Sequence, residues 1–325
     1  MSDFWISFPS VYQGLTLVQR RIEDIVSASR GFIRPYLQDM MGTQGKMLRP
    51  ACVLLSAQMG EKQDQEDLIT NLAAGIELIH AASLVHDDII DEAPMRRGAA
   101  ALHKRIGNRR AVVAGDYLMA KAFSLFSQAS LERINSRTVS DRIGRLCESE
   151  IDQDGEIGDF TISRTHYLRR IGGKTAALFS LSCYLGAAAG GVKPLQVRRL
   201  SRFGYNLGMA FQIQDDILDY QGDHQSMGKK TGRDLSAGIA TLPFLCARDK
   251  DRSGKLLKLV SDIPHDESSV DEAVSMVSSL GGVQCASEIA EAYQRRSLHE
   301  LALLPDVPAR EILGELLHRL TDRSS

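Results

Sequence analysis

The sequence contains little of what marks a secreted, zinc-binding or disulfide-stapled protein. Its 325 residues include five cysteines, which are odd in number, scattered along the chain and never spaced as a CxxC pair. A disulfide framework or a zinc site is therefore not expected, and reduced thiols in a cytoplasmic protein fit this pattern better. The N-terminal residues show neither a basic region nor an apolar run, so we expect no signal peptide.

The chain also lacks an excess of charge of one sign and a long hydrophobic run. Its formal net charge is −2, from 39 basic and 41 acidic residues, which gives no overall signal for binding nucleic acid or an anionic membrane. The most apolar stretch, residues 175–191, is interrupted by Ser180, Ser182 and Tyr184. This stretch predicts a helix buried on all sides rather than a membrane span.

Helical periodicity is what the chain does have, from end to end. Apolar residues recur at spacings of three and four, proline falls mainly between the periodic segments, and no stretch alternates convincingly as a half-buried strand does. We therefore predict an all-α fold, a large antiparallel helical bundle around a central cavity, in a single domain over residues 1–325. The expected helices span residues 68–90, 110–130, 138–153, 165–189, 196–220, 240–260, 269–279, 283–304 and 308–321.

One acidic motif occurs twice, each time at the end of a long apolar segment. The first runs from Asp87 to Asp91 as DDIID, and the second runs from Asp215 to Asp219 as DDILD. In a helix the outer aspartates of each triad share a face, where like charges destabilise by roughly 0.2–0.5 kcal/mol per pair. Carboxylate-only ligands suit a hard cation such as Mg²⁺, which would offset this repulsion. A solvated helix end explains one such motif equally well, but two favour a metal site.

Basic residues near the triads complete a predicted anion site. Each triad is followed by a basic loop that contains glycine, and two further basic segments lie elsewhere. These residues are Arg96 and Arg97, Lys229 and Lys230, Lys46 and Arg49, and Lys174 with Thr175. Mg²⁺ often binds through a few carboxylates and the phosphates of a substrate, while Arg and Lys side chains bind the remaining phosphate oxygens. The combination predicts a site for two diphosphates.

Five segments in this order resemble the trans-isoprenyl diphosphate synthases, also called the polyprenyl synthetase family. The segments are GKMLRP, ELIHAASLVHDDIIDEAPMRRG, AGDYLMAKA, YLRRIGGKTAALF and FQIQDDILDYQGDHQSMGKKTGRDL, between about Gly45 and Pro243. The resemblance implies a prenyltransferase that joins an allylic diphosphate to isopentenyl diphosphate with a cluster of three Mg²⁺ ions. It also implies a cytoplasmic homodimer without nucleic acid partners or a membrane span.

The resemblance further implies roles for individual residues. The ligands that it implies for isopentenyl diphosphate are Lys46, Arg49, His80 and Arg97. The carboxylates that it implies for Mg²⁺ are Asp87, Asp91 and Asp215. Contacts to the allylic diphosphate are implied for Arg96, Lys174, Gln212 and Lys229, and Thr175 and Gln212 would flank the carbocation. His86, by contrast, is expected to be a histidine with satisfied hydrogen bonds.

Product length is predicted from the turn that precedes the first triad. In short-chain members of the family an aromatic residue near the position of Ala82 blocks the path of the growing chain. Here Ala81, Ala82 and Ser83 are all small, which favours a long-chain product grown from farnesyl or geranylgeranyl diphosphate. Small residues suit close helix packing equally well. A deeper floor could come from Met119, Phe123 or Phe126.

Two departures from the family pattern leave alternatives open. Ile239 stands where the family usually has a lysine that faces phosphate, and residues 147–153 read CESEIDQ in place of the usual Gly-Glu before Gln153. The alternatives are a short-chain synthase with a farnesyl or geranylgeranyl product, a subunit of a heteromeric synthase, a class I terpene cyclase and a helical scaffold without activity. Activity of the purified chain alone would separate the enzyme from a non-catalytic subunit.

Overall fold

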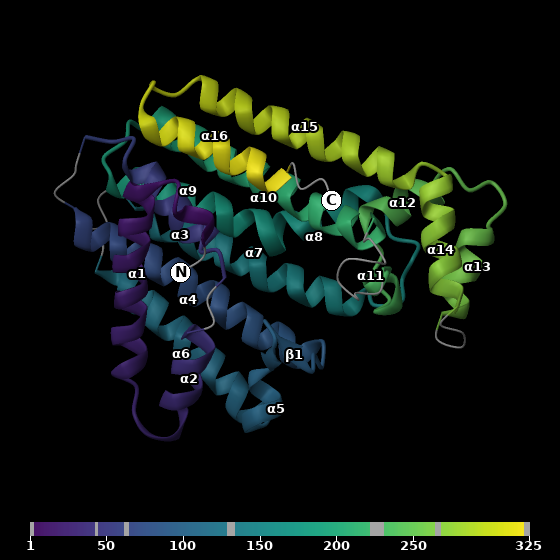
Figure 1. Cartoon of the computed structure of the whole chain (residues 1–325), viewed down its shortest axis with the longest axis horizontal. Helices are drawn as coiled ribbons and strands as arrows, with labels where there is room; N and C mark the ends of the chain where they lie inside the picture. Colours follow the sequence, from purple (N-terminus) through teal and green to yellow (C-terminus); the bar gives the residue numbers. More distant parts are fainter. Residues whose placement is uncertain are drawn as a thin grey trace. The chain divides into compact units, whose positions relative to one another are not determined.

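The computed structural model of the chain describes residues 3–42, 45–61, 65–128, 134–221, 231–263 and 268–321, which are almost entirely helical (Figure 1). Within these ranges the strands are limited to β1 (Met95–Arg96) and β2 (Ala99–Ala100), which pair antiparallel. The predicted all-α class is therefore confirmed. The hairpin between the two strands was not predicted, because two-residue strands carry no alternating pattern.

The residues divide into two compact units, each assembled from separate stretches of the chain. The N-terminal unit comprises residues 1–140, 181–201 and 304–313, and the C-terminal unit comprises residues 141–180, 202–303 and 314–325. The helices α7 (Ser136–Gly155), α9 (Ala177–Ala189), α10 (Pro194–Gln221) and α16 (Pro308–Thr321) contribute residues to both units. The expectation of a single domain over residues 1–325 stays a prediction.

The N-terminal unit is built mainly from the first half of the chain. Its helices are η1 (Asp3–Trp5), α1 (Pro9–Ser27), η2 (Gly31–Ile33), α2 (Arg34–Gly42), α3 (Leu48–Ala57), α4 (Glu66–Ile90), α5 (Leu102–Ile106) and α6 (Asn108–Ser127). Pro50 lies in the first turn of α3, where its missing N–H costs no hydrogen bond. The helices before α3 were not predicted.

Helix α4 is the core helix of this unit and carries the first triad at its end. Glu66 and Asp67 occupy its first turn, where acidic side chains interact favourably with the positive end of the helix dipole. By length and composition α4 could cross a membrane, but 78% of its most apolar window is buried inside the structure. It packs against α1, α3 and α6, as expected of the core helix of a folded protein.

Two glycines allow α4 and α6 to approach closely. A Cβ at Gly75 of α4 would lie 2.4 Å from the ring of Phe126, and a Cβ at Gly115 of α6 would lie 2.3 Å from the ring of His86. Both rings therefore occupy the space of an absent side chain. This packing fixes the C-terminal turn of α4 against α6, and with it the position of Asp87.

The C-terminal unit draws on the helices that follow α7, three of which it shares with the N-terminal unit. They are α8 (Arg164–Ile171), the π-helical turn η3 (Gly172–Ala176), α9, α10, α11 (Arg233–Ser236), α12 (Leu242–Arg248), α13 (Lys255–Asp262), α14 (Ser268–Ser279), α15 (Gly282–Ala302) and α16. The prediction of one helix over residues 240–260 is wrong. The chain leaves α12 at Asp249 and begins α13 after Gly254, which has a φ of 68°. Residues 249–254 separate the two helices, and glycine readily adopts the left-handed conformation found at the position before α13.

The π-helical turn lies where the sequence reads Gly-Gly-Lys-Thr-Ala. A Cβ at Gly173 would lie 1.8 Å from the hydroxyl of Ser149 on α7, and a Cβ at Gly208 of α10 would lie 2.6 Å from the Cα of Ala176. The turn is thus closely packed between α7 and α10. The helix beyond it is buried along almost its whole length, as predicted for residues 175–191.

Candidate active site

The predicted site residues fall into two groups, one in each unit. The first group lies in the N-terminal unit and consists of Lys46, Arg49, His80, Ala82, Ser83, Asp87, Asp91, Arg96 and Arg97. The second lies in the C-terminal unit and consists of Lys174, Thr175, Gln212 and Asp215. Lys229, like Lys230, lies outside the described residues. The expectation that Asp87, Asp91 and Asp215 together hold Mg²⁺ stays a prediction.

A guanidinium cluster forms where α3, α4 and the β1–β2 hairpin meet. Arg49 Nη1 lies 3.1 Å from Nε2 of His80. Arg97 and Gly98 have φ values of 50° and 81°, as the two central residues of a tight hairpin turn require. This turn explains the Arg-Arg-Gly sequence, because glycine is favoured at one of the two positions.

The charges of this cluster are set by burial and by Glu77, a residue that the sequence reasoning missed. Burial lowers the pKa of Arg49 to about 10, although the Glu77 carboxylate opposes that shift. The pKa of His80 falls well below its usual value because of burial and the positive charges of Arg49 and Arg97. His80 is therefore neutral, and its ring nitrogen accepts the hydrogen bond that Arg49 donates. Burial also raises the pKa of Glu77, while Arg49 and Arg97 counteract this.

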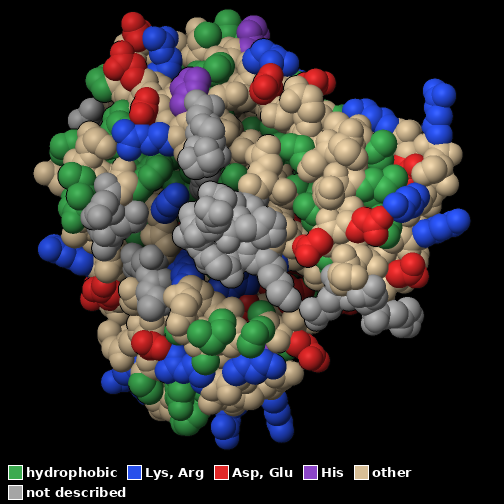
Figure 2. Space-filling model, turned by 45° about the vertical axis from the view of Figure 1, so that its right-hand side comes forward, with side chains coloured by type: hydrophobic (Ala, Val, Ile, Leu, Met, Phe, Trp, Pro, Cys, Tyr) green, Lys and Arg blue, Asp and Glu red, His purple; other side chains and the backbone are tan. Residues whose placement is uncertain are grey.

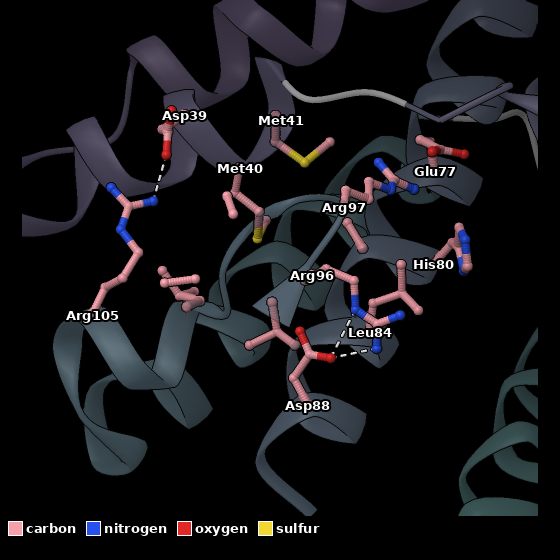
Figure 3. A pocket seen from close by; sticks show the side chains of 15 residues that line it. Asp39, Met40, Met41, Glu77, His80, Leu84, Asp88, Arg96, Arg97 and Arg105 are labelled. Carbon is pink, nitrogen blue, oxygen red and sulfur yellow. Dashed lines mark hydrogen bonds and ion pairs between the residues drawn. The ribbon is translucent and has the colours of Figure 1, made fainter. Parts of the chain in front are cut away.

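The cluster borders a pocket that is part apolar and part charged (Figure 3). The carboxylate of Glu77, the ring of His80 and the guanidinium of Arg97 lie on one side of it in Figure 3. Its lining residues are Asp39, Met40, Met41, Glu77, His80, Ala81, Leu84, Val85, Asp88, Arg96, Arg97, Ala99, Ala100, Leu102 and Arg105. A pocket of this composition suits a ligand with an anionic group and a short hydrocarbon part.

The three aspartates of the first triad have different surroundings. Asp88 is buried and accepts a hydrogen bond from Arg96 Nε at 2.8 Å, within an ion pair. Asp87 is also buried, whereas Asp91 caps α4 and is exposed. Arg96 forms an ion pair with the middle aspartate of the triad, and its predicted contact to a diphosphate stays a prediction.

The predicted chain-length residues are placed in the packed part of α4. Ala82 is fully buried and Ser83 is 8% exposed, and neither is among the residues that line the described pocket. Among the candidates for a deeper floor, Phe126 is buried against Gly75 while Phe123 is 44% exposed. Close packing thus accounts for part of the small-residue pattern, and the role in product length stays a prediction.

The second triad differs in what holds its middle aspartate. Asp216 accepts a hydrogen bond from the hydroxyl of Tyr167 at 2.5 Å and another from Nε2 of Gln212 at 2.8 Å. The oxygen of the same Gln212 amide accepts a hydrogen bond from Thr175 at 2.7 Å. Asp215 is exposed. Thr175 and Gln212, which were predicted to flank a carbocation, are therefore held in one hydrogen-bonded chain that ends at the triad.

Negative charge accumulates around this triad. Burial and the nearby Asp234 carboxylate raise the pKa of Asp216 to about 8. Burial and the Asp219 carboxylate raise the pKa of Asp234 to about 6. Asp219 itself is buried, forms an ion pair with Arg233 at 3.1 Å and accepts a hydrogen bond from the backbone N–H of Asp234. A cation bound here would relieve the repulsion among these carboxylates.

Lys174 and the loop near Ile239 are also held by protein groups. Lys174 Nζ forms an ion pair with Glu150 of α7 at 2.6 Å. Arg170 bonds to Glu156 at 2.7 Å and donates to the carbonyl of Ala240 at 2.8 Å. The backbone beside Ile239 is thereby tied to α8. Arg233, another basic residue of this loop, pairs with Asp219.

The sequence reasoning missed the residues that support the predicted ones. These are Glu77, Glu150, Tyr167 and Asp234. Tyr167 lies within the segment YLRRIGGKTAALF, eight residues before Thr175. Its position on the same helix was therefore visible, but its hydrogen bond to Asp216 depends on a partner far along the chain.

The residues fit a divalent cation that is shared with a substrate. The donors around both triads are carboxylate oxygens, which Mg²⁺ prefers. Among the described residues, no three His, Cys, Asp or Glu side chains form a group that could hold a metal ion alone. Mg²⁺ in proteins often binds through one or two carboxylates and completes its ligands with substrate phosphate and water.

Comparison with known proteins agrees with this chemistry. A family model described as polyprenyl synthetase matches residues 31–277, which is more than half of the chain. The chain belongs to the polyprenyl synthetase family. The match confirms the family that the five motifs predict. It also confirms the predicted class of enzyme, a prenyltransferase.

Individual polyprenyl synthetase relatives match over nearly the whole chain. Component 2 of heptaprenyl diphosphate synthase from Geobacillus stearothermophilus is 35% identical over 305 residues, 93% of this chain and 93% of that protein. Nonaprenyl diphosphate synthase from Mycobacterium tuberculosis is 33% identical over 316 residues, 97% of this chain and 93% of that protein. The crystal structure of a polyprenyl synthase from Caulobacter crescentus, in complex with calcium and isoprenyl diphosphate, matches with a TM-score of 0.87 and 31% identity. That match covers 97% of this chain and 96% of the other.

Proposed function

We propose that this chain is a Mg²⁺-dependent trans-polyprenyl diphosphate synthase. It extends an allylic diphosphate, farnesyl or geranylgeranyl, with successive isopentenyl diphosphates to a long-chain all-trans product. The observation that carries this proposal is the guanidinium cluster of Arg49 and Arg97, set by Glu77 and neutral His80 beside a partly apolar pocket. It offers an anion site of the kind that isopentenyl diphosphate needs, in a chain that also carries two aspartate triads.

The chemistry assigns a distinct task to each group of residues. Asp87, Asp91 and Asp215 would hold Mg²⁺, which stabilises the charge on the departing pyrophosphate. Lys46, Arg49 and Arg97 bind isopentenyl diphosphate, and Lys174 and Gln212 hold the allylic diphosphate in place. The bond from C1 to oxygen breaks, the isopentenyl double bond attacks C1, and the proton lost from the adduct passes to pyrophosphate. Apolar side chains keep water from the allylic cation.

Product analysis tests this function directly. The purified chain is incubated with Mg²⁺, isopentenyl diphosphate and either farnesyl or geranylgeranyl diphosphate, and the products are identified by mass spectrometry. We expect long-chain polyprenyl diphosphates, with no turnover when a chelator removes Mg²⁺. A product from farnesyl diphosphate that stops at geranylgeranyl diphosphate would contradict the long-chain assignment, and no product from the pure chain with either primer would contradict independent activity.

A second possibility follows from the Geobacillus relative, which is named as one component of a synthase. We propose instead a cytoplasmic homodimer that acts without another subunit. Figure 2 shows basic and acidic side chains interspersed on the face that it draws, with hydrophobic side chains among them. Light scattering of the active fraction distinguishes the two cases, since a homodimer has twice the mass of the chain and retains full turnover.

Product length is tested at Ala82. An Ala82→Phe variant should give a shorter product, because the ring would fill the space that we propose for the growing chain. Ala82 is fully buried, so the larger side chain also costs roughly 1–3 kcal/mol of stability through overpacking. A matched Ala73→Phe variant, at another fully buried alanine of α4, controls for this cost. An unchanged product distribution in Ala82→Phe would exclude this role.

A further inference from the structure

The chain has one tryptophan, and it is placed where it can act on the predicted substrate site. Trp5 lies in η1, ahead of α1, and is fully buried. Its ring makes edge-to-face contacts with Phe4 at 4.8 Å and with Phe8 at 6.1 Å between centroids. We call residues 4–8 the N-terminal clasp. Nothing in the five family-like segments includes these residues.

The clasp holds Lys46 through both its backbone and its side chain. The indole N–H of Trp5 donates a hydrogen bond of 2.6 Å to the carbonyl oxygen of Lys46. The ring of Phe4 lies under the ammonium of the same lysine, 5.4 Å from Nζ to the ring centroid. An aromatic face attracts an ammonium without neutralising it, so the charge stays available to an anion.

The segment that the clasp holds is strained and lies against Arg97. Met47 follows Lys46 with a φ of 49°, a left-handed conformation that costs energy in any residue with a Cβ. On the other side, a Cβ at Gly45 would lie 2.9 Å from a guanidinium nitrogen of Arg97. The turn of residues 45–47 is therefore confined between the clasp and Arg97, and it leads directly into the helix that carries Arg49.

We propose that Trp5 and Phe4 are positioning residues for isopentenyl diphosphate, which aim Lys46 by fixing the turn of residues 45–47. This inference rests on the proposed function, because it assigns the support of that site. The hydrogen bond from Trp5 ties the carbonyl of Lys46, next to the left-handed Met47, to the N-terminal clasp. Because the Lys46 side chain is already ordered, it loses little conformational entropy when its ammonium binds a diphosphate.

Steady-state kinetics test this role. In Trp5→Phe, which keeps an aromatic ring but lacks the N–H, the KM for isopentenyl diphosphate should rise about tenfold, the factor that one buried hydrogen bond supplies. In Phe4→Leu it should rise about threefold, and Phe4→Tyr should restore it, since tyrosine also attracts cations. The KM for the allylic diphosphate should stay unchanged in all three. An unchanged KM for isopentenyl diphosphate in Trp5→Phe would overturn the inference.

Two control variants separate positioning from loss of stability. Ile6→Ala changes an exposed side chain of the clasp, and Val11→Ala opens a cavity at a fully buried position of α1. Val11→Ala should lower the melting temperature while both KM values stay as in the wild type. If it raises the KM for isopentenyl diphosphate as much as Trp5→Phe does, the effect of Trp5 is structural and the inference is wrong.

Fluorescence gives a second readout that needs no turnover. Because Trp5 is the only tryptophan, the emission of the protein reports on the clasp alone. Inorganic pyrophosphate and isopentenyl diphosphate should each change this emission in the wild type, and the change should be lost in Lys46→Ala. A wild type that makes no prenyl product but shows the change would contradict the proposed function and keep the clasp. An active wild type without the change would contradict the clasp alone.

Discussion

The guanidinium cluster of the N-terminal unit and the carboxylates around Asp216 in the C-terminal unit differ in the groups that contact the middle aspartate of each triad. Around the first triad, the middle aspartate Asp88 is neutralised by Arg96, and the buried Glu77 lies near two arginines. Around the second, the middle aspartate Asp216 is held by the neutral groups of Tyr167 and Gln212. Burial and the neighbouring Asp234 carboxylate raise the pKa of Asp216.

This difference indicates which of the two clusters can bind an anion without a metal ion. Arginine side chains offer donors to a diphosphate without any further ion. Carboxylates repel a diphosphate unless a cation lies between them, so the second cluster depends on metal more strongly than the first. Although the two triads are nearly identical in sequence, their surroundings therefore predict different responses to substitution.

The largest expected effect is loss of turnover when a triad aspartate is removed. Asp215→Ala and Asp87→Ala should each lower kcat by orders of magnitude, because electrostatic stabilisation of the leaving pyrophosphate is usually the largest part of catalysis. The fold should survive, since removing like charges does not destabilise a helix. Asp24→Ala, at an exposed position of α1, serves as the control. Near-normal turnover of either triad variant at saturating Mg²⁺ would contradict the metal assignment.

The next effect concerns the neutral support of the second triad. Tyr167→Phe removes the hydroxyl that donates to Asp216 and leaves a buried carboxyl oxygen without that bond, at a cost of roughly 1–3 kcal/mol. We expect a lower melting temperature and a kcat about tenfold lower, because the chain from Thr175 through Gln212 loses its fixed end. Tyr12→Phe, at a more exposed tyrosine, should change neither. Wild-type kcat in Tyr167→Phe would show that Asp216 needs no such support.

A smaller effect is expected from restoring a cation beside the second cluster. Ile239→Lys should lower the KM for the allylic diphosphate, because a well-placed hydrogen bond to a charged group contributes roughly 1.5–3 kcal/mol. Desolvation and lost side-chain entropy reduce that gain. The backbone of this segment is already fixed by Arg170, so the new side chain is the only change. A higher or unchanged KM would show that another group already fills the position.

The smallest effect is a change in how stability depends on pH at Glu77. Its pKa in the folded protein is raised, mainly by burial. The protonated form therefore stabilises the fold at low pH, and this contribution is lost as pH rises from the unfolded pKa through the folded one. The loss can reach about 1.4 kcal/mol for each pH unit in that window. Facing groups are Arg49 on α3, His80 on α4 and Arg97 of the hairpin.

Glu77→Gln cannot ionise, so its stability relative to the wild type should increase as pH rises through the window. Urea unfolding at a series of pH values measures this difference. The slope with respect to urea should be the same in both proteins, since the substitution changes little of the surface exposed on unfolding. Parallel stability profiles of Glu77→Gln and wild type would mean that Glu77 has an ordinary pKa in the fold.

The features of the fold that the sequence predicted depend on residues within one segment of the chain. Long helices such as α4 and α10 follow from apolar spacing within the segment itself, and the triads stand at their ends as expected. The break between α12 and α13 was missed although residues 249–254 read DKDRSG, a polar run that ends in glycine. Helix α1 was missed although its buried residues, Val11, Leu15, Val18, Ile22 and Val26, recur at spacings of three and four.

The supporting residues of the site were beyond sequence reasoning for a different reason. Asp216 and its partner Tyr167 lie 49 positions apart, and Lys46 lies 41 positions from Trp5. No spacing rule connects such pairs, since only the packed chain brings them together. The roles predicted for Arg96 and Lys174 did not include ion pairs with Asp88 and Glu150. Neither segment of such a pair indicates the ion pair by its own sequence.

The π-helical turn has a consequence for insertions and deletions in this segment. Tyr167 and Thr175 are eight residues apart on one continuous helical path, yet they reach Asp216 and Gln212, which are one turn apart on α10. In a regular α-helix, a spacing of eight would separate the two side chains by about 80° around the axis. A π turn absorbs one extra residue, so the spacing acts as seven and the separation falls to about 20°. Deleting Gly173 or Lys174 would leave a regular helix with a spacing of seven, so the two side chains would still share a face, about 20° apart. A variant shortened by one residue at this point should therefore keep both side chains directed at α10, whereas a full-length variant forced into a regular α-helix here should turn one of them away.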